Sequence, residues 1–113
     1  MSRKQRSYLA QLRSGILPIA IETGRWIGTL PSERLCFVCN TDVVENETHF
    51  LFTCSAYQQE RQSLYSDISE FEPNVLTMSI CDRLKLLMQA NVIVRFSKYL
   101  CNIYDKRRSI LYE

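Results

Sequence analysis

Long apolar runs are missing from this 113-residue chain, and none approaches the roughly 18 residues that a membrane-spanning helix requires. The N-terminus has basic residues but no apolar stretch behind them, so it does not match a secretory signal. We therefore expect an intracellular protein, nuclear or cytoplasmic, without a membrane partner. Only three glycines and three prolines interrupt the sequence, which argues against long linkers and predicts a single domain over residues 1–113.

Catalytic side-chain sets are also scarce. The chain has one histidine, and no Ser/His/Asp set, paired carboxylate site or glycine-rich phosphate loop is visible. General acid–base and nucleophilic catalysis usually depend on such combinations. We therefore expect that the chain is not an enzyme on its own.

Charge is nearly balanced overall but unevenly distributed. The formal net charge is +2, yet residues 1–28 carry five basic side chains and one acidic one. Residues 29–81 carry two basic and eight acidic side chains, and residues 82–113 carry seven basic and three acidic ones. The cationic ends could contact RNA or DNA, or could simply offset the acidic middle. The pI of 8.3 lies below the value of about 9 that is typical of nucleic-acid-binding domains. The candidate phosphate contacts are Arg3, Lys4, Arg6, Arg13, Arg25, Lys106, Arg107 and Arg108.

Apolar residues recur at helical spacing through most of the chain, which predicts a mainly α, small helical domain. The first helix should cover residues 3–14 and end at Gly15. Residues 16–33, interrupted by glycine and proline, are expected to be extended with turns, and "RLCFVC" is expected to form a short strand. The domain then has three parts, a basic N-terminal part, a central part and a C-terminal helical pair, over residues 1–30, 31–72 and 73–113.

A long helix is predicted from residue 46 to about residue 71, because apolar residues there follow steps of three and four. Asn46 is placed to cap its N-terminus. Arg61 interrupts the apolar stripe and should either extend toward solvent along its stem or pair with an acid. Two further helices follow, the first capped by Ser79 and the second preceded by a break at Asn91.

Three of the five cysteines and the single histidine fall within "CFVCNTDVVENETHFLFTC", residues 36–54. Cys36 and Cys39 have the Cys-x2-Cys spacing of a zinc knuckle, and His49 and Cys54 supply a second pair. Zinc in structural sites takes four such thiolate and imidazole ligands tetrahedrally. We therefore predict a zinc site on these four residues, with the knuckle packed on the start of the long helix.

Several features of the segment agree with a metal site. Five cysteines are an odd number that suits a disulfide framework poorly, and thiols inside a cell stay reduced. Asn40 follows the second cysteine, where a knuckle often needs the left-handed conformation that asparagine tolerates. His49 and Cys54 are five residues apart, a spacing that an ideal helix does not bring to one face. We therefore expect the helix to distort between them.

The same residues allow other interpretations. The cysteines could be ordinary buried residues and the histidine a satisfied core side chain, since cysteine is among the most buried residue types. A thioredoxin-like redox role for Cys36 and Cys39 lacks the βαβ setting that such chemistry uses. Cys81 and Cys101 have no partners at metal spacing and are predicted to lie in the core.

The segment "RLCFVCNTDVVENETHFLFTCSAY" resembles the zinc-binding domain that lies C-terminal to the polymerase in reverse transcriptases of non-LTR retrotransposons. The upstream "LAQLRSGILPIAIETGRW" is also similar, so the resemblance covers about residues 7–65, although Asn40 stands where glycine is usual. It implies a retroelement-derived fragment or domesticated relative, in which this region helps to hold RNA or DNA near a polymerase domain on another chain. The matching residues are Cys36, Cys39, Glu47, Thr48, His49, Phe50, Leu51 and Cys54.

Two functions follow as hypotheses. The first is a zinc-stabilised nucleic-acid-binding accessory domain, in which Trp26 or Tyr8 could stack on an unpaired base, unless both aromatics pack in the core. The second is a structural zinc module for protein–protein contact through the acidic side of the long helix. A translated remnant of a decayed element, without a function of its own, is a third interpretation. The acidic residues concerned are Glu60, Asp67, Glu70 and Glu72.

Overall fold

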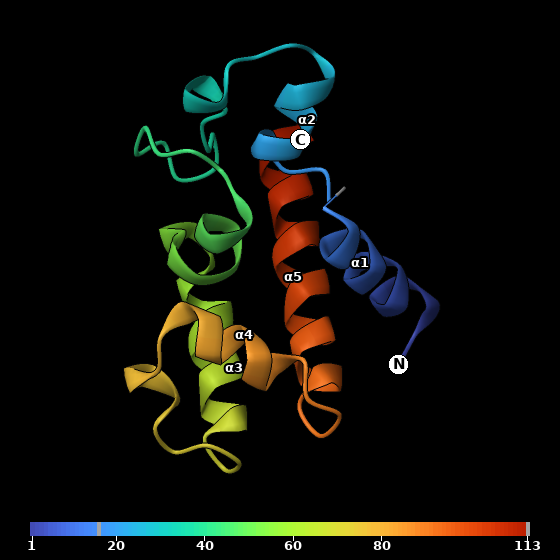
Figure 1. Ribbon diagram of the computed structural model, residues 1–113, viewed down its shortest axis with the longest axis vertical. Coiled ribbons are helices and arrows are strands. Elements are labelled where there is room, and N and C mark those ends of the chain that lie inside the picture. The colour runs from blue at the N-terminus through green and yellow to red at the C-terminus, as the bar shows by residue number, and fades with distance from the viewer. Residues whose placement is uncertain (16, 113) are drawn as a thin grey trace.

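The computed structural model describes residues 1–15 and 17–112, and within them the chain is mainly α-helical, as predicted (Figure 1). Ile16, the first residue of the predicted extended stretch, lies outside the described residues. In the described ranges no β-strand occurs, and an isolated antiparallel bridge between Leu35 and Val44 takes the place of the predicted strand. The α-helices are α1 (Arg3–Ser14), α2 (Ala20–Trp26), α3 (Gln58–Ile68), α4 (Ile80–Leu87) and α5 (Ile93–Tyr112). The shorter helical turns are η1 (Pro31–Glu33), η2 (His49–Thr53), η3 (Ser55–Tyr57) and η4 (Val75–Thr77).

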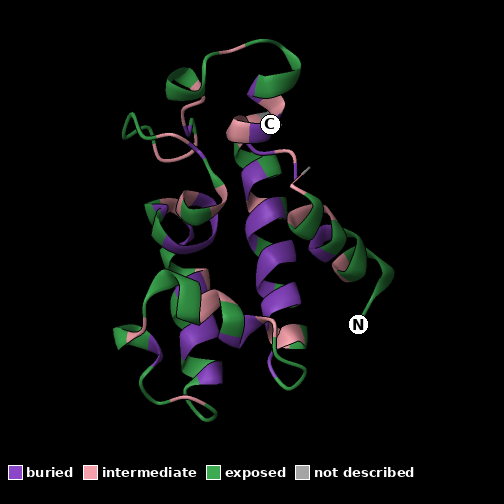
Figure 2. Ribbon diagram, viewed as in Figure 1, coloured by how far each residue is buried: buried purple, intermediate pink, exposed green. Residues whose placement is uncertain are grey.

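The 20-residue helix α5 forms the centre of the fold, with α1 packed along one side and α3 along the other (Figure 1). Its inward residues Phe96, Leu100 and Ile103 are fully buried, and Figure 2 shows the buried band along the helix. Tyr104 meets Tyr8 of α1 edge to face, with ring centroids 4.8 Å apart. Neither α5 nor any other helix within the described residues is long and apolar enough to cross a membrane.

The helix α1 forms over the residues that the sequence predicts. Ser2 and Gln5 build a capping box: the Ser2 hydroxyl accepts from the Gln5 N–H at 3.1 Å, and the Gln5 side chain accepts from the Ser2 N–H at 2.7 Å. Gly15 ends the helix with a φ of 68°, a conformation that costs glycine little. Both ends of α1 are therefore determined by residues next to them in the sequence.

The prediction of extended backbone over residues 16–33 is wrong, because α2 forms within it. The residue before this helix, Ile19, offers no side-chain cap. Glu45 supplies the cap from 25 residues away: its Oε1 accepts from the Ala20 N–H at 2.6 Å, and its backbone oxygen accepts from the Ile21 N–H at 2.9 Å. A carboxylate also suits the positive N-terminal end of a helix. The helix α2 thus depends on a tertiary contact that no local pattern reveals.

The prediction of one continuous helix over residues 46–71 is also wrong. Asn46 does cap the first turn, since its Oδ1 accepts from the His49 N–H at 2.8 Å. The chain then forms the π-helical turn η2, becomes extended at Cys54, passes through η3 and only then enters α3. The Cys-x2-Cys loop therefore faces a short π-turn and not the start of a long helix.

Arg61 shows how this interruption is stabilised. The side chain is buried and forms no ion pair with an acid among the described residues, so both predictions for Arg61 are wrong. It donates to the carbonyl oxygen of Leu51 at 3.3 Å and to that of Cys54 at 2.9 Å. Carbonyl groups at the end of a helical turn lack partners within the helix. Arg61 satisfies two of them where η2 ends.

The C-terminal half agrees with the predicted helical pair, with one correction. Ser79 caps α4 by accepting from the Asp82 N–H at 3.2 Å, and Asn91 lies in the turn before α5. Cys101 is buried, as predicted, but Cys81 is exposed at the start of α4 and does not belong to the core. Only one side of this short helix is buried, and Cys81 lies outside it.

Replacing Leu100 by alanine should lower the free energy of unfolding by about 2–5 kcal/mol, because it opens a cavity at the centre of the core. The matched control is Val94→Ala on the exposed side of the same helix, which should change stability by less than about 0.5 kcal/mol. Urea denaturation followed by circular dichroism measures both. Equal losses for the two variants would contradict the central position of α5.

Candidate metal centre

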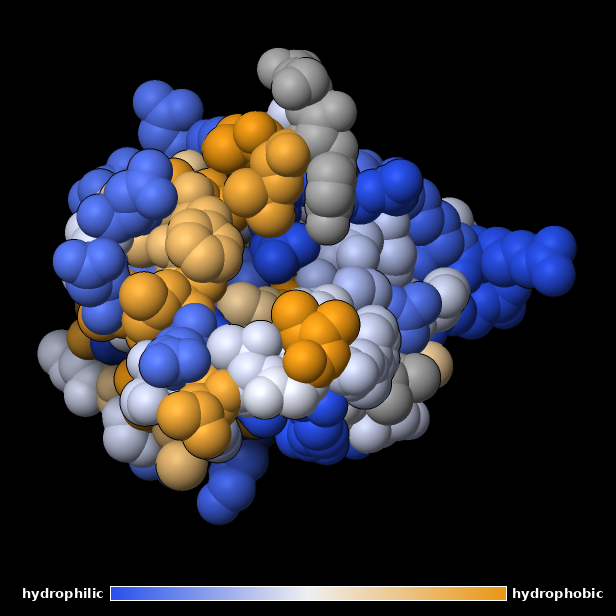
Figure 3. Space-filling model, turned by 90° about the horizontal axis from the view of Figure 1, so that it is seen from above, coloured by the Kyte–Doolittle hydropathy of each residue, from blue (hydrophilic) through white to orange (hydrophobic). Residues whose placement is uncertain are grey.

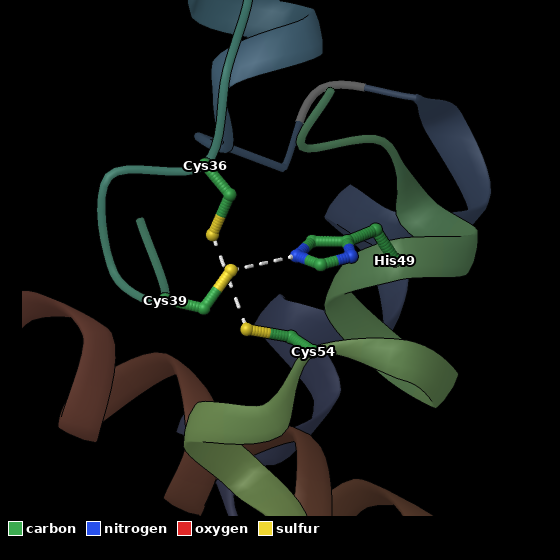
Figure 4. A group of neighbouring side chains, drawn as sticks. All are labelled: Cys36, Cys39, His49 and Cys54. Carbon is green, nitrogen blue, oxygen red and sulfur yellow. Dashed lines mark hydrogen bonds between the residues drawn. The ribbon is translucent and has the colours of Figure 1, made fainter. Parts of the chain in front are cut away.

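The four predicted ligands converge on one point (Figure 4). Their three sulfurs and one imidazole nitrogen all lie within 4.8 Å of one another. Cys36 Sγ is 3.9 Å from Cys54 Sγ, and Cys39 Sγ is 3.5 Å from His49 Nε2. In a tetrahedral zinc site with bonds of about 2.0–2.3 Å, ligand atoms are roughly 3.5–3.8 Å apart. This donor set and its spacing could therefore hold a metal ion.

The Cys-x2-Cys loop is shaped by its own backbone. The Cys36 N–H donates to the Val43 oxygen at 2.8 Å, which pairs the two sides of the loop. Backbone hydrogen bonding from Cys39 and Val38 lowers the pKa of the Cys36 thiol. Asn40 has a φ of 54°, the left-handed conformation predicted for this position. The loop thus curls around the sulfur that it presents to the centre.

The five-residue spacing between His49 and Cys54 is accommodated by η2. A π-helical turn closes hydrogen bonds between residues five apart, and the Cys54 N–H donates to the His49 oxygen at 2.8 Å. An ideal α-helix would direct these two side chains about 140° apart. The distortion that the sequence predicts between the two residues is confirmed, and single π-turns of this kind are frequent at functional sites.

The imidazole of His49 is oriented by Thr53. The Thr53 hydroxyl lies 3.1 Å from His49 Nδ1 and donates to the His49 backbone oxygen at 3.5 Å. A hydroxyl that donates to the carbonyl can accept from Nδ1–H, and Nε2 is then the acceptor nitrogen facing Cys39. Histidines that bind metals use a partner of this kind to fix the tautomer and the ring orientation.

Hydrogen bonding favours negative charge on Cys36, whereas burial opposes negative charge on both Cys36 and Cys54. Cys36 and Cys54 are buried, whereas Cys39 and His49 are half-buried. The contact with Cys54, followed by the backbone N–H groups of the loop, holds the pKa of Cys36 below its ordinary value. The same contact and burial raise the pKa of Cys54. A cation at the centre would stabilise both sulfurs as thiolates.

Tyr57 is a buried polar residue three positions after the ligand residue Cys54. The residue is fully buried, and among the described residues its hydroxyl has no hydrogen-bond partner. Burial raises the pKa of this phenol, and the neighbouring Cys54 and Glu45 raise it further. The Tyr57 side chain is therefore a neutral, buried hydroxyl.

Glu45 is the residue of this region that sequence reasoning misses. It is 1% exposed, and its carboxylate accepts from Arg107 at 2.7 and 2.8 Å. Its Oε2 is also 3.9 Å from Cys36 Sγ. The available signal is an acid within "VVEN", beside an apolar pair and between two metal-ligand positions. Its basic partner lies 62 residues away, beyond the reach of any local pattern.

The structure divides the predicted phosphate contacts into three groups. Arg107 is buried against Glu45, so its prediction as a phosphate contact is wrong. Three others form ion pairs nearer the surface: Lys4 with Asp105, Arg25 with Glu22, and Lys106 with Glu60, at 2.6, 3.3 and 3.0 Å. The remaining four are exposed and have no ion pair with any described residue: Arg3, Arg6, Arg13 and Arg108.

The two candidate stacking residues differ in exposure. Tyr8 is buried against α5 and belongs to the core. Trp26 is 64% exposed at the end of α2, and Phe37 in the Cys-x2-Cys loop is 65% exposed. Ile27 and Leu30 are exposed as well, and apolar side chains gather across this end of the molecule in Figure 3. We call the exposed set Trp26, Ile27, Leu30 and Phe37 the apolar end.

Comparison of the chain with protein-family models, with curated proteins and with solved structures gives no significant match. The resemblance to the retrotransposon zinc-binding domain therefore stays a prediction from the quoted residues. The same holds for the expected lack of enzymatic activity. The convergence of the four ligand residues rests on the geometry of the chain itself.

Purified protein should contain one equivalent of bound metal, and Cys36→Ser should lose it, because that sulfur is buried at the middle of the site. Inductively coupled plasma mass spectrometry identifies and counts the metal. Cys81→Ser is the matched control, because this cysteine is exposed and distant from the centre in sequence. Metal retained in Cys36→Ser, or lost equally in both variants, would contradict the assigned ligands.

Proposed function

We propose that this chain is a zinc-stabilised module that binds single-stranded nucleic acid and is non-catalytic alone. The observation that carries the proposal is the set of three sulfurs and one imidazole nitrogen within 4.8 Å. Thiolate and imidazole ligands in a tetrahedral set favour zinc over calcium or magnesium, which prefer oxygen. Four protein ligands leave no open position for water, which supports a structural role for the ion.

Exposed cations on α1 support contact with phosphates. Arg3, Arg6 and Arg13 lie on one face of the helix at spacings of three and seven, and all are exposed. None of the three forms an ion pair with a described residue, so their guanidinium groups can bind phosphate oxygens through paired N–H donors. Such contacts provide affinity that does not depend on sequence.

The apolar end supports contact with unpaired bases. Trp26 and Phe37 expose about two thirds of their surface, although large aromatics usually bury most of theirs. Stacking of one base on an aromatic side chain contributes about 1–3 kcal/mol and requires that the base is not paired. This favours single strands over duplex as the ligand. The retrotransposon resemblance agrees with a role beside a polymerase domain on another chain.

Contact with a protein is the second candidate, and a different observation favours it. Ile27 and Leu30 are 81% and 62% exposed, and aliphatic side chains cannot stack on bases as aromatics do. Contiguous exposed apolar surface often marks a protein interface. In that case the apolar end would be the contact, and not the predicted acidic residues Glu60, Asp67, Glu70 and Glu72. Capture of a specific protein that survives nuclease treatment would favour this candidate.

Binding to a single-stranded RNA should weaken steeply as salt rises, because phosphate contacts release counterions. Replacing Arg3, Arg6 and Arg13 together by glutamine should make the slope of log K against log salt shallower by about 2. The control replaces Lys85 and Lys98, which are exposed elsewhere, and should leave the slope unchanged. Fluorescence anisotropy measures each titration. No binding at low salt would refute the nucleic-acid part of the proposal while leaving the metal site intact.

Trp26→Ala should weaken binding to single-stranded RNA by about 1–3 kcal/mol, roughly 5- to 150-fold, and should leave the salt dependence unchanged. Phe71→Ala is the matched control, since Phe71 is also an exposed aromatic but lies outside the apolar end. The same anisotropy assay compares the variants. Equal effects of the two substitutions would contradict a stacking role for the apolar end.

A further inference from the structure

Arg107 lies beside the metal centre without supplying a ligand. It is 7% exposed, and its guanidinium donates from Nη2 to Glu45 Oε1 and from Nε to Glu45 Oε2. The second of these oxygens is the one that lies 3.9 Å from Cys36 Sγ. A continuous path of contacts therefore runs from a metal-ligand sulfur, through one buried carboxylate, to the C-terminal part of α5.

Both oxygens of this carboxylate are held by groups from different elements. Oε1 accepts from the Ala20 N–H at the start of α2 as well as from Arg107. Oε2 faces Arg107 and Cys36. Glu45 itself belongs to the segment between the two ligand pairs. Any movement of residues 36–54 therefore moves the Glu45 carboxylate, to which both α2 and α5 are hydrogen-bonded.

Arg107 also has an electrostatic role at this centre. Three thiolates around a dication carry one excess negative charge, and Glu45 adds another beside Cys36. Like charges about 4 Å apart repel strongly in buried surroundings. Arg107 faces Glu45 directly, whereas Arg61, the other arginine buried within the described ranges, donates to backbone carbonyls. Arg107 is thus the cation that offsets the Glu45 charge.

From these contacts we infer that Arg107 is a positioning residue of the metal centre, and that zinc binding and docking of the C-terminal turns of α5 stabilise each other through Glu45. The inference rests on the proposed zinc binding. Because coupling between two equilibria is reciprocal, bound zinc holds the end of α5 in place, and loss of Arg107 weakens zinc binding. Partners in the outer shell of metal sites typically change metal affinity by about 10- to 100-fold.

Zinc affinity of the full chain, measured by competition with a chromophoric chelator, tests the electrostatic part. Arg107→Met should weaken binding by about 10- to 100-fold, because Glu45 is left charged and unpaired beside Cys36. Arg107→Lys keeps the charge and should stay within a few-fold of wild type. The double variant Glu45→Gln with Arg107→Met removes both charges and should recover most of the affinity. Arg108→Met is the matched control on the exposed side of the same helix.

These variants distinguish the effect of the Arg107 charge on zinc affinity from the effect of the space that its side chain fills. If Arg107 acted only by filling space, the double variant would bind zinc as weakly as Arg107→Met. Cobalt(II) absorption spectra provide a second readout: an unchanged band shape in Arg107→Met shows that the three sulfurs still bind and that the change lies outside the ligands. Arg107→Met that remains folded and binds zinc within twofold of wild type would overturn the inference.

Hydrogen exchange on the wild-type chain tests the coupling without any substitution. Removal of zinc with a chelator should speed exchange in the last turns of α5 and the first turn of α2, and should affect the α5 segment around Leu100 much less. Unchanged exchange at the end of α5 would overturn the inference. An equal rise along the whole helix would also do so, because it reports general unfolding and not a link at Arg107.

The outcomes distinguish this inference from the proposed function. Wild-type protein that contains no zinc would overturn both. Zinc bound with equal affinity by wild type and Arg107→Met would overturn the inference alone and leave the metal site in place.

Discussion

The buried ion pair between Glu45 and Arg107 connects parts of the chain that are 62 residues apart. Removing two charges from water is costly, and here the cost is offset by two guanidinium hydrogen bonds and by the Ala20 N–H. Breaking one side would leave a buried charge without a partner. The Glu45 carboxylate therefore holds three elements together: the start of α2, the Cys-x2-Cys loop and the end of α5.

The candidate metal centre is built on the same segment. Backbone hydrogen bonds shape the Cys-x2-Cys loop on one side, and the π-turn η2 sets the spacing of His49 and Cys54 on the other. A domain of this size buries a modest core, so a bound ion would contribute substantially to its stability. With an ion bound, the ligands within residues 36–54 would hold the Cys-x2-Cys loop in place, and Glu45 in the same segment would hold α2 and α5.

The predictions that agreed with the structure concern features encoded by neighbouring residues. The helix α1 is bounded by a capping box and a left-handed glycine, both recognisable in the sequence. The predicted helix over residues 46–71 shows where periodicity misleads. Phe50, Cys54 and Tyr57 are all fully buried, so the spacing identified most of the buried face, but Phe71 at the end of the predicted helix is 42% exposed. It could not reveal that the backbone leaves the helix at Cys54, because a π-turn followed by a 3-10 turn preserves nearly the same apolar spacing.

By itself, the sequence determined the mainly helical class, the limits of α1 and the four residues that converge at the candidate metal centre. Each of these depends on the spacing of residues within about twenty positions. Only the tertiary structure decided that Arg107 is buried while Arg3 stays at the surface, and that Trp26 is exposed while Tyr8 joins the core. The physical reason is that burial and ion pairing depend on which elements meet in space. Glu45 and Arg107 meet only after the chain has folded.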